Sequence, residues 1–172
     1  MVEKTKAYIA GFLDGDGSIF LQLVPRKGYR LGYQVRASVV FYQKTSQKMI
    51  LRWLKHKLRM GYLRDRNDNL SEYTIVGLRE VAVVLKELLP YLLIKRKQAK
   101  LALRIISKLE EVSSIDSKML LKIATEVDKF KDLNYSKKRV NTAAKIKEFL
   151  KNQNLVPVST DLRQELRLDV VR

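Results

Sequence analysis

The chain has 172 residues, of which 35 are lysine or arginine and 18 are aspartate or glutamate, so its formal net charge is +17. Apolar residues make up 46% of it, too many for a disordered basic tail, and the length suits one compact domain. The lack of cysteine excludes disulfides and cysteine zinc sites, and the single histidine, His56, excludes multi-histidine metal sites. No apolar run reaches the ~18 residues of a membrane span and the first residues lack a signal-peptide pattern, so we expect a soluble, intracellular protein that binds polyanions.

The first half of the chain is expected to begin with a helix and two strands. Residues 7–13 are apolar enough for a helix, which the glycine-rich Gly15-Asp16-Gly17 would end. Residues 18–24 and 33–42 are expected to be strands, separated by a basic loop at 25–32. In the second strand Val35, Ala37, Val39 and Phe41 alternate with Gln34, Arg36 and Ser38, the period-2 pattern of a strand with one buried face.

The rest of the chain adds a second pair of strands and several helices. A helix is expected at 49–58, a hairpin at 61–66 and 71–76, and helices at 79–88, 94–109, 117–130 and 140–151. This order predicts an α+β domain of the αββαββα type, whose four-stranded antiparallel sheet is covered on one face by helices. We take residues 1–152 as that single domain and 153–172 as a C-terminal extension of unknown role, in which 157–172 could be an extra helix or disordered.

Positive charge is concentrated in one part of the chain. From Gly17 to Arg64 inclusive there is no acidic residue, although eleven residues there are lysine or arginine. A face of one sign most often binds nucleic acid, because neutralised phosphates release counterions. The alternative is a ribosomal-type or merely solubilising basic surface.

The uncovered face of the predicted sheet is polar. Arginine suits guanine and glutamine suits adenine in the major groove of DNA, so this face fits base readout, although an ordinary solvated face is the alternative. The residues expected to contact DNA are Phe20, Gln22, Gln34, Arg36, Ser38, Tyr62, Arg64, Arg66, Glu72 and Thr74 on this face, with Arg26 and Arg30 from the basic loop.

Residues 9–17 read I-A-G-F-L-D-G-D-G. They resemble the LAGLIDADG motif of homing endonucleases in their small residues, both aspartates and the last glycine. The resemblance continues through the second strand, Gln43-Lys44-Thr45, the G-Y-L-R-D-R segment at 61–66 and K-R-K-Q-A at 95–99, and so spans residues 7 to 130. Because the motif occurs once, the chain is most similar to the single-motif, homodimeric members of that family.

One face of the motif helix carries almost no side chains. Ala7, Gly11 and Gly15 recur at intervals of four, which places them on the same side of a helix. Such a face lets two helix backbones approach closely, so we expect a two-fold dimer interface there. Tight packing within the same domain is the alternative.

The two aspartates at the end of the motif invite different interpretations. Either could cap the helix or close a tight turn, and we assign Asp14 to this architectural role. The carboxylate of Asp16 and the backbone carbonyl of Gly15 are oxygen ligands of the kind that Mg²⁺ accepts while keeping water and phosphate oxygens. The family resemblance implies that Asp16 is a metal ligand, and dimerisation would place two copies of it side by side.

The resemblance also implies further catalytic residues and cofactors. Gln43 matches a residue that orders water in the active site, and Lys95 matches a lysine near the scissile phosphate. Near relatives often carry a second basic residue about one turn after Gln43, where this chain has Gln47 followed by Lys48. The expected cofactor is Mg²⁺, with Mn²⁺ able to substitute and Ca²⁺ supporting binding without efficient cleavage.

These features favour a homing-type endonuclease that cuts a long pseudo-palindromic double-stranded DNA site. The family resemblance implies that the cuts lie across the minor groove and leave short 3′ overhangs. No small-molecule substrate or membrane is expected, and an organelle or a prokaryotic cytoplasm fits equally well. The alternative is a non-cleaving binder of the same fold, either an intron RNA maturase or a transcription regulator. Asp16 favours the enzyme, because a pure binder has no need of that acid. A ribosomal or chromatin-like protein would not explain the motif.

Overall fold

A computed structural model describes residues 1–134 and 140–155 of the chain. The elements are α1 (Glu3–Asp16), β1 (Gly17–Pro25), β2 (Tyr33–Lys44), η1 (Thr45–Gln47), α2 (Met49–Leu58), β3 (Tyr62–Asp65), β4 (Leu70–Val76), α3 (Leu78–Leu88), η2 (Leu89–Tyr91), α4 (Arg96–Glu110), α5 (Ser117–Asp128), α6 (Phe130–Leu133) and α7 (Ala143–Asn152). The strands form one antiparallel sheet in the order β1-β2-β4-β3. The predicted α+β architecture is therefore confirmed.

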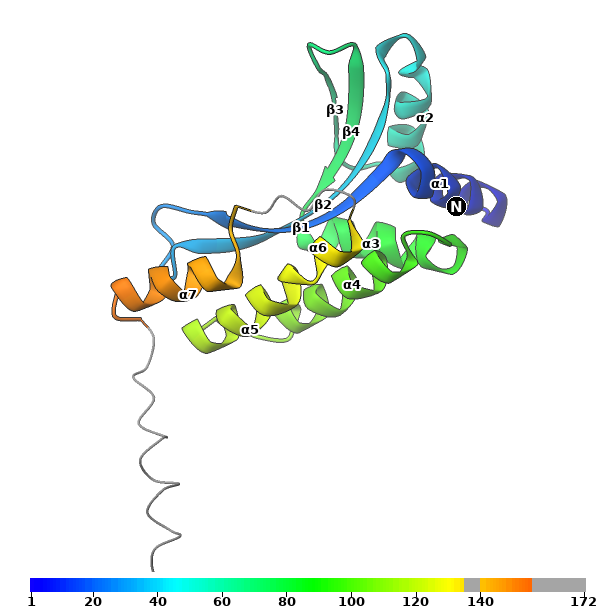
Figure 1. The fold of residues 1–172 in the computed structure, drawn as a ribbon. Coiled ribbons are helices and arrows are strands. Elements are labelled where there is room, and N and C mark those ends of the chain that lie inside the picture. The colour runs from blue at the N-terminus through cyan, green and yellow to red at the C-terminus, as the bar shows by residue number, and fades with distance from the viewer. Residues whose placement is uncertain (135–139, 156–172) are drawn as a thin grey trace, which may run out of the picture.

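The sheet is curved, and the helices gather on one side of it. Figure 1 shows α3, α4, α5 and α7 beneath β1 and β2, and α2 beside the end of the sheet formed by β3 and β4. The opposite face of the sheet is left without a helix by the described part of the chain (Figure 1). None of the described helices is long and apolar enough to cross a membrane.

The core lies between the sheet and these helices. The alternating residues Val35, Ala37, Val39 and Phe41 of β2 are between 0% and 6% exposed, as their period-2 pattern predicts. Their partners include the buried apolar side chains of α1 and α3. Because burial of apolar surface is the main favourable term in folding, this layer fixes which face of the sheet remains open.

Several boundaries differ from the sequence prediction. Helix α1 begins at Glu3 and continues through Gly15 and Asp16, so these two residues belong to its last turn rather than to a loop. The N–H of the next residue, Gly17, closes that turn by donating to the carbonyl of Leu13. The helix expected at 117–130 is divided into α5 and α6. The segment 157–172, expected to be helical or disordered, lies outside the described residues.

The turn that starts β3 depends on a glycine. Gly61 has φ +77°, and a Cβ there would lie 2.4 Å from the carbonyl oxygen of Thr74 in the neighbouring strand. The adjacent carbonyl of Met60 accepts a hydrogen bond of 2.6 Å from the hydroxyl of Tyr73, whose pKa is raised by burial. Together these contacts fix the hairpin that carries Tyr62 and Arg64.

Candidate functional site

The carboxylate of Asp14 joins the end of α1 to the start of α4. Its Oδ2 accepts the backbone N–H groups of Leu93 (2.7 Å) and Ile94 (3.1 Å), and its Oδ1 accepts that of Lys95 (2.8 Å). Asp14 is only 8% exposed. The expected architectural role therefore holds, but its partners lie 79 to 81 positions further along the chain rather than in its own turn.

The side chain of Lys95 makes a second hydrogen bond to Asp14. Its ammonium nitrogen donates a hydrogen bond of 2.5 Å to the backbone carbonyl of Asp14. Burial lowers the pKa of Lys95, while the nearby charges of Asp14 and Asp16 act in the opposite direction. The side chain is thus held in one place, with its ammonium group facing the end of α1.

Asp16 stands at the last position of α1 and is exposed. Its side chain makes no hydrogen bond or ion pair with the described residues, in contrast to that of Asp14. The carbonyls of the last helical turn carry partial negative charge, and the carbonyl of Gly15 belongs to that turn. This end of α1 therefore offers oxygen donors to a hard cation.

The described residues contain no group of three or more His, Cys, Asp and Glu able to hold a metal ion. The donor set of one chain is thus one carboxylate and one helix-end carbonyl. Such a set fits Mg²⁺, which commonly keeps several waters and is completed by substrate phosphate oxygens.

A hollow brings the predicted catalytic residues together. It is lined by the end of α1 with Gly15 and Asp16, by β1, by Gln43 and Lys44 at the end of β2, by the start of α4 with Ile94, Lys95 and Lys97, and by parts of 132–134 and 140–141. We call this the α1–β2–α4 hollow. Lys44 and Lys97 were not singled out from the sequence, where they could not be told from other lysines of the basic segments.

Gln43 is half-buried at the edge of this hollow. Its side-chain carbonyl accepts a hydrogen bond of 2.9 Å from the backbone N–H of Lys44. This contact orients the amide group, so its nitrogen is left as the donor that could meet a water molecule.

Strand register places the predicted DNA-contacting strand residues on one face. Residues directly opposite each other in an antiparallel pair point to the same side, and the cross-strand pairs here are Phe20 with Ser38, Gln22 with Arg36, Val24 with Gln34, Tyr62 with Thr74 and Arg64 with Glu72. This is the face that no described helix covers. The β2–β4 register pairs Tyr42 with Glu72 and so joins the two sets on one side of the sheet. The shared face is therefore confirmed for the predicted residues that lie in strands. Arg66 follows the end of β3 and has no register partner, and all contacts with DNA stay a prediction.

Not every residue on this face is accessible. Ser38 is 6% exposed and Thr74 is 5% exposed, so the expectation that they present wet surface is wrong. Both are short side chains in the central strands β2 and β4 of the sheet. In contrast, Gln22, Arg36 and Arg64 are exposed.

The two arginines of the loop between β1 and β2 differ in placement. Arg26 donates through Nε to the side-chain oxygen of Gln34 at 3.0 Å, so it belongs to the sheet end. Arg30 instead donates through Nη2 to the backbone carbonyl of Ile115 at 3.0 Å, in the connection between α4 and α5. The loop thus directs Arg30 toward the helical side, and the structure does not bring it to the open face.

Arg64 and Arg66 converge on one acid. Glu72 lies 3.2 Å from Nε of Arg64 and 4.0 Å from Nη1 of Arg66, and Arg66 also meets Asp68 at 2.7 Å. Arg64 keeps 65% of its side chain exposed, whereas Glu72 keeps 14%. Glu72 therefore orients two guanidinium groups that remain accessible from the open side.

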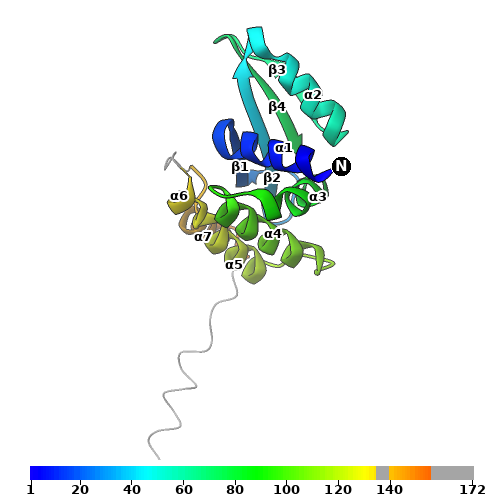
Figure 2. The ribbon, with the colours of Figure 1, turned by 90° about the vertical axis from the view of Figure 1, so that its right-hand side faces the viewer.

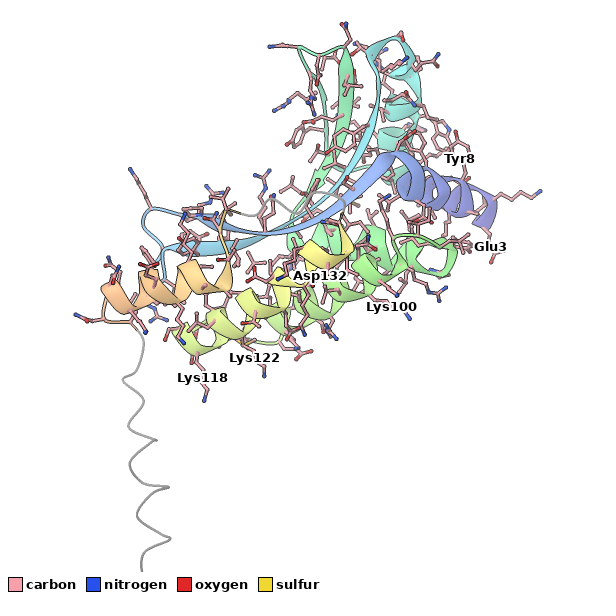
Figure 3. The ribbon with its side chains drawn as sticks, in the orientation of Figure 1. Glu3, Tyr8, Lys100, Lys118, Lys122 and Asp132 are labelled. Carbon is pink, nitrogen blue, oxygen red and sulfur yellow. The ribbon has the colours of Figure 1, made fainter. Side chains whose placement is uncertain are left out.

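The small-residue face of α1 is open. Ala7, Gly11 and Gly15 are all exposed, and a Cβ at either glycine would meet nothing within 4 Å. Packing of this face within its own domain, the alternative left by the sequence, is therefore wrong. Figure 2 shows α1 in front of the sheet on the side turned to the viewer, and Figure 3 labels Tyr8, another exposed α1 residue.

Comparison with known proteins connects this arrangement to a family. The family model described as LAGLIDADG endonuclease matches residues 9–105. The chain is 43% identical over 145 residues to the DNA endonuclease I-CvuI of Chlorella vulgaris, covering 84% of this chain and 89% of that protein. It is 36% identical over 143 residues to the DNA endonuclease I-CreI of Chlamydomonas reinhardtii, covering 83% and 86%.

Solved structures are similar as well. The structure of I-CvuI in complex with the I-CreI target in the presence of 2 mM Mg, with the DNA not cleaved, superposes with a TM-score of 0.84 at 41% identity, covering 90% of this chain and 98% of that one. The DNA complex of the archaeal intron-encoded I-Vdi141I shares the fold with a TM-score of 0.78 at 14% identity, covering 90% and 99%. By its motif, its fold and these relatives, the chain belongs to the LAGLIDADG endonuclease family.

Proposed function

We propose that this chain is a site-specific double-strand DNA endonuclease of the homing type, which works as a homodimer with a divalent cation. One observation carries the proposal most directly. The exposed Asp16 carboxylate stands in one hollow with Gln43 and Lys95, beside an open sheet face that bears cationic and amide side chains. A nuclease needs this combination, because the sheet face can hold the duplex while the hollow receives a phosphate.

Each residue of the hollow has a separate task in this mechanism. Asp16 and the carbonyl of Gly15 would hold Mg²⁺, which supplies Lewis-acid stabilisation of the oxygens in an in-line displacement. Gln43 donates its amide N–H to water and so orients it. Lys95 places positive charge near the phosphate that is cut. Asp14 acts at one remove, because it fixes the backbone from which Lys95 extends.

The cation preference follows from the donor set. Mn²⁺ is expected to substitute for Mg²⁺, because it also favours octahedral oxygen ligands. Ca²⁺ has larger and looser coordination, so it should support binding of DNA without efficient cleavage. The related I-CvuI has crystal structures with the I-CreI target in the presence of 2 mM Mg and with its own target in the presence of 2 mM Ca.

The homodimer is proposed from the open face of α1. Two copies meeting through Ala7, Gly11 and Gly15 would place both Asp16 residues close to a two-fold axis. Two sheets would then form a long surface that fits a pseudo-palindromic site, with both cuts near the axis and short 3′ overhangs. The endonuclease domain comprises residues 1–152, and 153–172 are an extension of it. Helix α7 belongs to the domain because the ring of Phe149 packs edge-on against that of Tyr33, with 5.2 Å between the ring centroids.

Gly11→Leu tests the dimer. The new side chain has open space within one chain but would push the two helices apart, with an overpacking cost of roughly 1–3 kcal/mol or more. We expect unchanged thermal unfolding of the monomer, loss of the dimer in sedimentation and loss of cleavage. A wild-type protein that sediments as a monomer at micromolar concentration, with and without DNA, would contradict the dimer.

The activity itself is tested by selection. Wild-type protein is incubated with Mg²⁺ and a library of pseudo-palindromic duplexes, and the ends of the cut products are sequenced. We expect one family of long sites cut with a fixed short 3′ overhang, and no cutting after chelation of the metal. Binding to structured RNA with no cleavage of any duplex would instead favour the non-cleaving alternative, a maturase or transcription regulator.

A further inference from the structure

The α1–β2–α4 hollow contains more positive charge than the proposed catalytic residues use. Besides Lys95, its lining includes Lys44 at the end of β2 and Lys97 in the first turn of α4. Both of these lysines are exposed, and neither side chain makes a hydrogen bond or ion pair with the described residues. The hollow therefore holds cationic groups in a position to meet an anion.

Lys95 is only partly available for such an anion. It is 8% exposed, and its ammonium group donates to the carbonyl of Asp14. A buried ammonium group that already donates to a protein carbonyl still contributes positive charge to the site, but it has fewer N–H groups left to donate to a phosphate than an exposed lysine has. A phosphate with developing negative charge would be better stabilised by a second, freely accessible cation.

Lys48, the next basic residue after Lys44 in the sequence, is already held in an ion pair. Lys48 pairs with Asp65 at 2.7 Å, and Asp65 is held in turn by the hydroxyl of Ser71 at 2.6 Å. Lys48 does not line the hollow, and position 47 is a neutral glutamine. On the β2 side of the hollow, Lys44 is thus the lysine that remains accessible.

The backbone directs Lys44 toward the bound duplex. Successive strand residues point to opposite faces, so Lys44 shares the open face with Tyr42 and Arg36. The backbone N–H of Lys44 donates to the side-chain oxygen of Gln43, so the lysine and the proposed water-orienting residue are held together. A phosphodiester lying across the open face would therefore lie on the side of the sheet to which Lys44 points, whereas Lys97 belongs to α4.

We propose that Lys44 contacts the phosphate that is cut and neutralises the negative charge that develops on its oxygens, as the second cation of the site beside Lys95. This inference rests on the proposed endonuclease function. It assigns to Lys44 an effect on the chemical step that a remote phosphate contact would not have. A remote contact would change affinity and its salt dependence alone.

The test compares three single substitutions at saturating enzyme on the selected DNA site. Lys44→Gln is expected to lower the single-turnover cleavage rate with Mg²⁺ by roughly 10²-fold, with DNA affinity in Ca²⁺ changed much less. Lys44→Arg should recover most of the rate, because it restores the charge. Lys100→Gln is the charge-matched control, since Lys100 is exposed and points away from the sheet (Figure 3), and it should cleave at the wild-type rate.

Two results would overturn the assignment. One is a Lys44→Gln rate within threefold of the Lys100→Gln rate, and the other is a Lys97→Gln rate reduced far more than that of Lys44→Gln. Failure of the proposed function is distinguishable, because the wild-type protein itself would then not cut any duplex. An unfolded Lys44→Gln variant would be recognised by its loss of DNA affinity in Ca²⁺. In that case Lys44→Arg decides. A Lys44→Arg cleavage rate near that of wild type supports the proposal, and a rate reduced by roughly 10²-fold contradicts it.

Discussion

The end of α1 and the β3–β4 end of the sheet hold their functional side chains by different physical means. At the end of α1, the buried carboxylate of Asp14 accepts hydrogen bonds from three backbone N–H groups, and the buried ammonium group of Lys95 donates one to the backbone carbonyl of Asp14. At the β3–β4 end, Arg64, Arg66 and Glu72 meet through ion pairs at the surface. The first arrangement is expensive to disturb, whereas surface ion pairs contribute little to stability.

This difference matches the two tasks. Bond cleavage needs groups held within a fraction of an ångström, and a buried hydrogen-bond network supplies that rigidity. Base readout needs guanidinium groups that are oriented but still accessible, and exposed pairs permit exchange of partners when DNA binds. The two regions should therefore respond to mutation in opposite ways, one in stability and the other in specificity.

Asp14→Ala is expected to have the largest effect on stability. It removes the acceptors of three backbone N–H groups in a buried place, at an estimated cost of about 3–4 kcal/mol in the free energy of unfolding. Denaturant titration measures this. The matched control is Asp16→Ala, two positions away and exposed, which should change stability by no more than about 0.5 kcal/mol. Equal effects of both substitutions would erase the contrast between a structural and a functional aspartate.

Arg64→Ala should alter specificity more than stability. We expect a loss of about 1–3 kcal/mol of discrimination at one symmetric pair of base positions. Glu72→Gln should cause a smaller loss there with equal or tighter binding to unrelated DNA, because it removes an acid that pairs with Arg64 and lies near phosphates, while Arg66 keeps its ion pair with Asp68. Binding to a panel of single-base-pair variants in Ca²⁺ measures both. Uniform weakening across the panel would mean that Arg64 contacts phosphate and not bases.

The smallest expected effect is a pH dependence at the β3–β4 end. The hydrogen bond from Lys48, followed by that from Ser71, lowers the pKa of Asp65 below its usual range. A carboxyl group whose pKa is lowered in the folded state stabilises that state at pH values above its ordinary pKa of 3.8. This contribution is lost as the pH falls through the lowered pKa. Asp65→Asn should therefore flatten the acid limb of the stability profile. An acid limb identical to wild type would show that the pair adds nothing.

The sequence predicted the open face of the sheet and the end of α1 unequally. Alternation in β2 was enough to place Gln34 and Arg36 on an open face, because the side-chain period of a strand is local information. The link from Asp14 to the start of α4 joins residues 79 to 81 positions apart, so no local pattern contains it. The motif indicated that Asp14 is architectural, but only the folded structure identifies its partners, which lie at 93–95 between η2 and α4.

The misplaced contact residues have a similar cause. A period-2 pattern assigns a face, but it does not tell how deeply a short side chain lies among longer neighbours, so the burial of Ser38 and Thr74 was missed. Arg30 was grouped with its loop by charge alone, whereas its partner carbonyl belongs to Ile115 in a distant connection. Both outcomes depend on tertiary placement rather than on residue type.

The most direct test is Asp16→Asn, assayed for cleavage with Mg²⁺ and for gel-shift binding with Ca²⁺ beside the wild-type protein. The substitution keeps size and shape but removes the charge that would hold the cation. We expect normal folding, binding that is equal or tighter because two negative charges facing phosphates are gone, and no detectable cleavage. Cleavage at the wild-type rate would contradict the metal site, and joint loss of folding and binding would show that Asp16 is architectural.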